Sequence, residues 1–70
     1  MKLVVYSKNK RTGELSEYTS FDLSYVKSIT PVTQTSESKK LLGTGVKITC
    51  QDTEDIFMGD SFYDIHLIFE

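Results

Sequence analysis

The lone cysteine, Cys50, is the feature that most constrains what this chain can fold into. With one cysteine the chain cannot close an internal disulfide, and with one histidine, His66, it cannot build a typical structural zinc site. A chain of 70 residues buries only about 60% of the surface that its unfolded form exposes, so its margin of stability is thin. We therefore expect one small domain, residues 1–70, whose stability comes from a compact core or from self-association.

Hydrophobic runs in the chain are short. None reaches the roughly 18 apolar residues that a membrane span needs. The apolar part of residues 1–6 is too short for a signal-peptide core and lacks a small-residue cleavage site after it. We expect no membrane contact and a cytoplasmic location, in a bacterium or in an infected host cell.

The first third of the sequence predicts a hairpin. Residues 2–7 are predicted to form a strand, because residues 3–6 are rich in β-branched and aromatic side chains and are apolar on both faces. Residues 8–13 form a polar turn in which Gly13 can supply a positive φ. Residues 14–20 follow as a second strand, and the odd spacing of its apolar residues predicts a bulge or an edge position.

The middle of the chain predicts more strands. A turn over 21–24 leads to a strand over about 25–33, which contains Pro31 and therefore does not suit a central position. The polar segment 33–40 is expected to be a mobile loop. Residues 46–50 alternate strictly, with a possible extension back through 41–45, and form a second hairpin with residues 56–58 across an acidic turn.

The last segment is ambiguous between a helix and a strand. Ser61 and Asp64 match a capping box, and the apolar residues that follow can share a helical face. Ile65 and Leu67 also alternate as in a strand. We favour the helix, which predicts an α+β fold with a small antiparallel sheet of about five short strands, two hairpins and a C-terminal helix. An all-β small barrel is the alternative.

Residues that could perform chemistry are few and scattered. His66 is the one conventional base and is expected at the surface, whereas Cys50 is in phase with Val46 and is expected to point into the core. The acids between 52 and 55 lack the glycine and the distal glutamate of a calcium-binding loop. We therefore expect no catalytic site, no metal and no cofactor.

Charge is distributed unevenly along the chain. Residues 1–50 hold all eight bases and four acids, whereas residues 51–70 hold six acids and no lysine or arginine. This asymmetry could steer a partner or pair two copies head to tail. We favour the simpler interpretation that the two parts are solvated ends of one domain.

These observations favour a non-enzymatic protein–protein interaction module, in the style of the small regulatory or inhibitory proteins that phages and mobile elements encode, and a homodimer is expected. The alternative is a β-rich nucleic-acid-binding protein that uses a basic hairpin tip over 8–11, with tyrosines as stacking faces; the acidic pI near 5.3 disfavours it. The candidate partner-binding residues are Tyr6, Lys8, Lys10, Arg11, Tyr18, Asp52, Glu54 and Asp55.

Overall fold

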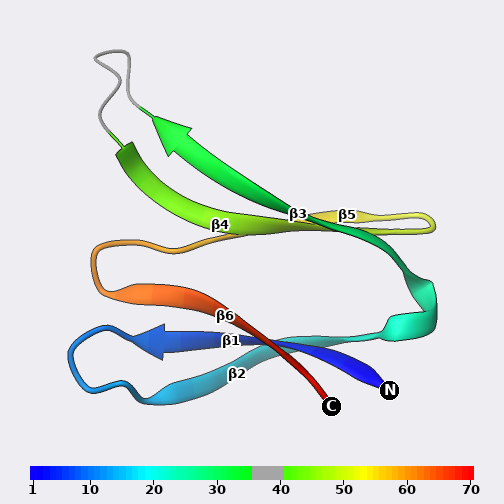
Figure 1. Cartoon of the computed structure of the whole chain (residues 1–70), viewed down its shortest axis with the longest axis horizontal. Helices are drawn as coiled ribbons and strands as arrows, with labels where there is room; N and C mark the ends of the chain where they lie inside the picture. The colour runs from blue at the N-terminus through cyan, green and yellow to red at the C-terminus, as the bar shows by residue number, and fades with distance from the viewer. Residues whose placement is uncertain (36–40) are drawn as a thin grey trace.

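The computed structural model describes residues 1–35 and 41–70, and these form strands almost throughout (Figure 1). The elements, in chain order, are β1 (Lys2–Asn9), β2 (Leu15–Asp22), the 3-10 helix η1 (Leu23–Tyr25), β3 (Val26–Thr35), β4 (Leu41–Cys50), β5 (Glu54–Met58) and β6 (Tyr63–Phe69). Within the described ranges, no helix is long and apolar enough to cross a membrane.

The strands make two antiparallel three-stranded sheets. Their orders are β2-β1-β6 and β3-β4-β5, so β1 and β4 are the central strands. Figure 1 shows the two sheets as two layers, joined by η1 at one end and by the β5–β6 turn at the other. The core lies between the layers, where Leu3 and Val5 of β1 meet Val46 and Ile48 of β4.

The first strand holds the first layer together because it is apolar on both faces, as the sequence predicts. Leu3, Val4 and Val5 are all fully buried. Leu3 and Val5 point toward the second layer, and Val4 lies on the opposite face between Ser20 of β2 and Ile68 of β6. β-branched residues suit such a strand because they pack well against cross-strand neighbours.

The predicted C-terminal helix is wrong, and with it the α+β class. Residues 63–69 form β6, which pairs with β1 along its whole length without a register shift. The capping signal was misplaced: Asp60 Oδ1, and not Ser61, accepts the backbone N–H groups of Phe62 and Tyr63. That turn starts a strand, whose alternating Ile65 and Leu67 then pack on the core.

The architecture also differs from the alternative that the sequence left open. The described strands form two separately hydrogen-bonded sheets, and not one sheet closed into a barrel. They number six, where about five were expected. The chain is therefore all-β, built from two packed layers.

Several local predictions are confirmed. The β1–β2 and β4–β5 hairpins form, and β4 does extend back through the 41–45 segment. The predicted bulge lies at Tyr18, the extra residue between Thr19 and Glu17 where the register with β1 shifts, and β2 is an edge strand. The turn expected over 21–24 is confirmed with shifted bounds: it is η1, Leu23–Tyr25, with Asp22 as its N-cap, whereas residues 21 and 22 still belong to β2. Of the loop predicted over 33–40, residues 33–35 belong to β3 and 36–40 lie outside the described residues.

Candidate functional site

The two long edges of the layered structure differ, and one of them is closed by aromatic rings. The Phe57 ring of β5 packs edge-on against the ring of Tyr18, at 5.6 Å between centroids, and against that of Phe21, at 6.0 Å. Both partners belong to β2, so the edge formed by β2 and β5 is sealed. The bulge at Tyr18 is part of this seal, because the extra residue occurs where the ring meets Phe57.

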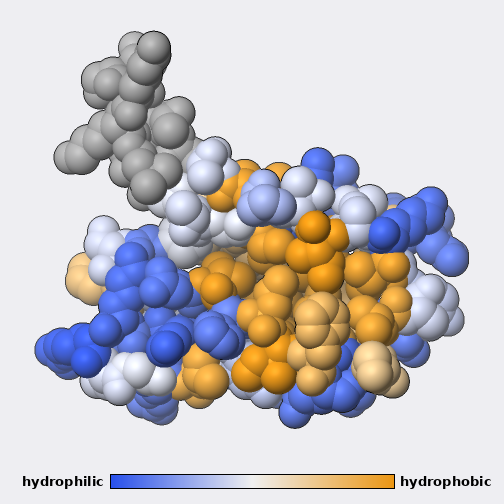
Figure 2. All heavy atoms as spheres, viewed as in Figure 1, coloured by the Kyte–Doolittle hydropathy of each residue, from blue (hydrophilic) through white to orange (hydrophobic). Residues whose placement is uncertain are grey.

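The opposite edge, between β3 and β6, is open and apolar. Because β2 and β5 share one edge, the strand orders place β6 and β3 at the other. Phe69 of β6 pairs with buried Leu3 yet is 58% exposed, and Ile29 of β3 pairs with buried Ile48 yet is 36% exposed. Figure 2 shows hydrophobic side chains gathered in a band between the two layers on this side. We call this surface, with Ile29, Ile65, Leu67 and Phe69, the open edge.

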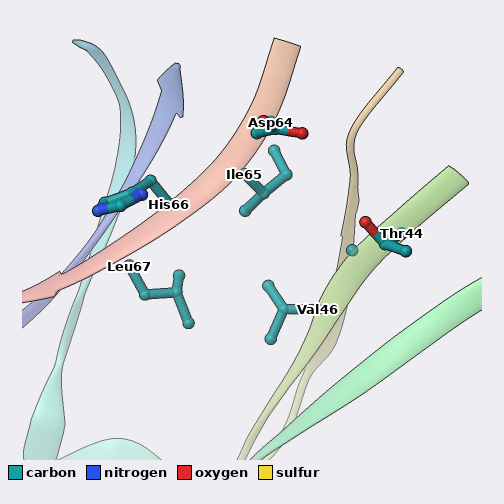
Figure 3. A pocket seen from close by; sticks show the side chains of 7 residues that line it. Thr44, Val46, Asp64, Ile65, His66 and Leu67 are labelled. Carbon is teal, nitrogen blue, oxygen red and sulfur yellow. The ribbon is translucent and has the colours of Figure 1, made fainter. Parts of the chain in front are cut away.

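The close view in Figure 3 shows how the layers meet behind the open edge. Ile65 and Leu67 of β6 point toward Val46 of β4, across a hollow of about 390 Å³. His66, the residue between them, points away from the hollow. The alternation along β6 therefore sends odd-numbered residues to the core side and leaves His66 exposed at the surface, as the sequence predicts, although on a strand.

The basic hairpin tip lies beside the β5–β6 turn. Lys10 and Arg11 line a hollow of about 510 Å³ together with two aromatic residues, Phe62 and Tyr63. Phe62 is 71% exposed, and the backbone N–H of Lys10 donates to its carbonyl oxygen at 3.0 Å. The sequence reasoning missed this pairing of bases and rings because it placed Phe62 on a helix.

The folded chain also brings the two oppositely charged parts of the sequence together. Lys8 is opposite Asp64 in the β1–β6 register, and Lys10 Nζ lies 3.5 Å from Asp64 Oδ1. Here the basic and acidic parts are neighbours and not separate ends. Both side chains of the ion pair are about half exposed, so its contribution to stability is small.

The two predicted tyrosines do not form one platform. Tyr6 pairs with Glu17 and His66 on the outer face of its sheet, whereas Tyr18 contacts Phe57 at the closed edge. Partial burial, followed by the nearby carboxylates of Glu70 and Glu17, raises the pKa of the Tyr6 phenol. Tyr6 is therefore a neutral, partly buried part of the outer face.

The three predicted acids near residue 53 are also spread out. Asp52 is exposed in the turn before β5, whereas Glu54 and Asp55 lie on β5 itself, on opposite faces of the strand. Glu54 Oε1 is 3.8 Å from Lys47 Nζ across the β4–β5 pair. In the described residues no group of three acids, histidines or cysteines is arranged to hold a metal ion. Cys50 is half-buried against the core, as predicted.

Asp60 fixes the turn that starts β6. Its Oδ1 accepts the Phe62 N–H at 2.7 Å and the Tyr63 N–H at 2.8 Å, while its own N–H donates to the Tyr63 carbonyl oxygen. These two backbone donors, more than nearby Lys10, hold the pKa of the Asp60 carboxyl below its usual value. The ionised carboxylate therefore stabilises the turn.

We expect the Asp60→Ala variant to be less stable than the wild type at pH 7 and less sensitive to acid. Because the folded state lowers this pKa, the stabilisation is present above the unfolded value of about 3.9 and is lost as the pH falls through the folded value. Thermal melts at pH 7 and pH 3 check this. A difference in melting temperature between the two proteins that is as large at pH 3 as at pH 7 would contradict it.

Comparison with protein-family models, with curated proteins and with solved structures finds no match for this chain. The functional interpretation therefore depends on the geometry described above.

Proposed function

We propose that the protein is a non-enzymatic protein–protein interaction module and that the open edge is its contact surface. The observation that carries the proposal is the exposure of Phe69 and Ile29 on the core side of the two sheets. An apolar core that reaches the surface along one edge gains free energy when another protein covers it, at about 25 cal/mol for each Å² of apolar surface buried. Such a module suits a regulatory or inhibitory accessory role, in which contact and not chemistry produces the effect.

The experiment is affinity capture from the native cell with matched lysine variants. Ile29→Lys places a charge on the open edge, and we expect it to lose the partner that the wild-type chain captures. Ser20→Lys introduces the same charge on β2, on the outer face of the closed side, and is expected to retain the partner. Capture by the Ile29→Lys variant at the wild-type level, with circular dichroism showing a folded chain, would overturn the proposal.

A second candidate function is binding of single-stranded nucleic acid at the basic tip. The observation that favours it is the hollow in which Lys10 and Arg11 flank the exposed rings of Phe62 and Tyr63, because bases stack on such rings. The ion pair of Lys10 with Asp64 weakens this candidate. Binding to DNA or RNA that fades steeply with added salt would promote it over protein contact.

A further inference from the structure

Among the edge strands described, β6 is the one that has no bulge, no proline and more than five residues. β2 carries the bulge at Tyr18, β3 contains Pro31, which lacks an N–H donor, and β5 is only five residues long. Bulges, prolines and very short strands are the usual features that prevent an edge from pairing. β6 has seven residues, a regular register with β1, and no proline, lysine or arginine.

The hydrogen bonds of β1 and β6 show which backbone groups of β6 face outward. Lys2 and Glu70 exchange both backbone hydrogen bonds, Lys2 N to Glu70 O at 2.6 Å and Glu70 N to Lys2 O at 2.8 Å. Antiparallel pairs alternate between bonded and non-bonded types, so the even-numbered residues of β6 bond to β1. The odd-numbered residues then direct their N–H and C=O groups to the exposed edge.

Ile65, Leu67 and Phe69 supply the free outward groups of β6, and each presents one donor and one acceptor along the open edge. The fourth odd-numbered residue, Tyr63, uses both of its backbone groups in the turn: its N–H donates to Asp60 Oδ1 and its carbonyl accepts the Asp60 N–H. The side chains of Ile65, Leu67 and Phe69 are also those that form the apolar surface of β6 there.

We propose that a second copy of this chain covers the open edge by pairing its β6 antiparallel with β6, about a twofold axis at Leu67. In this register Leu67 is opposite its own equivalent, and Ile65 of each copy is opposite Phe69 of the other. All six outward backbone groups of each copy are then hydrogen-bonded. Each core-side residue of one β6 lies opposite a core-side residue of the other, on the same face of the joined sheet. A twofold axis at His66 would use only four of the six, because Phe69 would be opposite the occupied Tyr63.

The side chains of the proposed register are compatible. An aromatic residue opposite a β-branched one is a favourable cross-strand pair, and it covers the exposed Phe69 ring. On the outer face Asp64 comes opposite Glu70 of the second copy. Each of these acids has a lysine beside it within its own chain: Lys10 lies 3.5 Å from Asp64, and Lys2 is opposite Glu70. The register therefore brings two acids together at positions where each has a lysine as its neighbour on β1 or on the hairpin tip.

The inference rests on the proposed function, because it names the partner of the open edge. Its test is sedimentation of the full chain at micromolar concentration, where we expect a dimer of the 8.0 kDa chain. Phe69→Lys puts an inward-pointing charge on the edge and is expected to weaken dimerisation at least tenfold. Phe62→Lys makes the same substitution at an exposed ring in the turn and is expected to leave the dimer intact.

The register has a separate test in a Cys50→Ser background. Leu67→Cys places two cysteines about 5.5 Å apart between Cα atoms, within disulfide range, so mild oxidation should cross-link the two chains. His66→Cys is expected to remain uncross-linked, because its equivalent in the second copy lies diagonally, about 7 to 8 Å away. Cross-linking at 66 in place of 67 would overturn the register.

Two other results would overturn the inference. One is a wild-type chain that sediments only as a monomer; partner capture would then still decide the proposed function. The other is a dimer that Phe69→Lys, shown by circular dichroism to be folded, leaves as stable as in the wild type.

Discussion

Replacing Leu3 by alanine is expected to lower the free energy of unfolding by about 3 kcal/mol, because the change leaves a cavity in the centre of the core. Leu3 is fully buried in β1, and its cluster includes Val5, Val46 and Ile48 from both layers. A domain of 70 residues has a total stability on the order of 4 to 10 kcal/mol. This one substitution therefore removes a large share of the stability of the fold.

Urea denaturation followed by circular dichroism measures this effect, and the chain provides a matched control. Leu15→Ala makes the same change on β2, where the leucine is 41% exposed on an edge strand. We expect this control to cost well under 1 kcal/mol, as is usual for surface positions. Equal shifts of the two midpoints would show that the core is not centred on β1.

The first strand and both hairpins could be predicted because their signals are local. Residues 3–6 are apolar on both faces, and the spacing of Leu15 and Tyr18 indicates the bulge that β2 contains. The last segment could not be predicted in this way, because its local pattern fits both a helix and a strand, and the capping signal favours the wrong one. The deciding contact is the pairing of β6 with β1, which is more than fifty residues away along the chain.

The open edge could not be predicted from the sequence either, because it depends on the order of strands in two sheets. Nothing local indicates that Phe57 reaches Tyr18 and closes one edge, or that β3 and β6 share the other. The sequence did indicate surplus apolar surface, but it assigned this to the first strand, whose Leu3, Val4 and Val5 the structure buries completely. The surplus is found at Phe69 and Ile29, on strands whose partners could not be known in advance.

Gly45 is a further position whose role the sequence concealed. The segment 43–45 suggests a flexible entry to the strand, but Gly45 lies within β4 between Val32 of β3 and Met58 of β5. A Cβ atom at Gly45 would collide with the backbone carbonyl oxygen of Phe57 and lie 2.8 Å from Met58 Cα. Because these are backbone atoms, the clash cannot be relieved by a rotamer change.

We therefore expect Gly45→Ala to destabilise the protein by about 3 kcal/mol, at the upper end of the range for overpacking, and to loosen the β4–β5 pair. Gly43→Ala is the graded control, because its Cβ would approach the Gly59 carbonyl oxygen only to 3.1 Å and needs a shift of a few tenths of an ångström. Hydrogen exchange at the β5 amides, with denaturation midpoints for both variants, measures the effect. If Gly45→Ala is no less stable than Gly43→Ala, the close approach of β5 to β4 at Gly45 does not constrain the fold. The position of Phe57 at the closed edge must then be set by its ring contacts with Tyr18 and Phe21 alone.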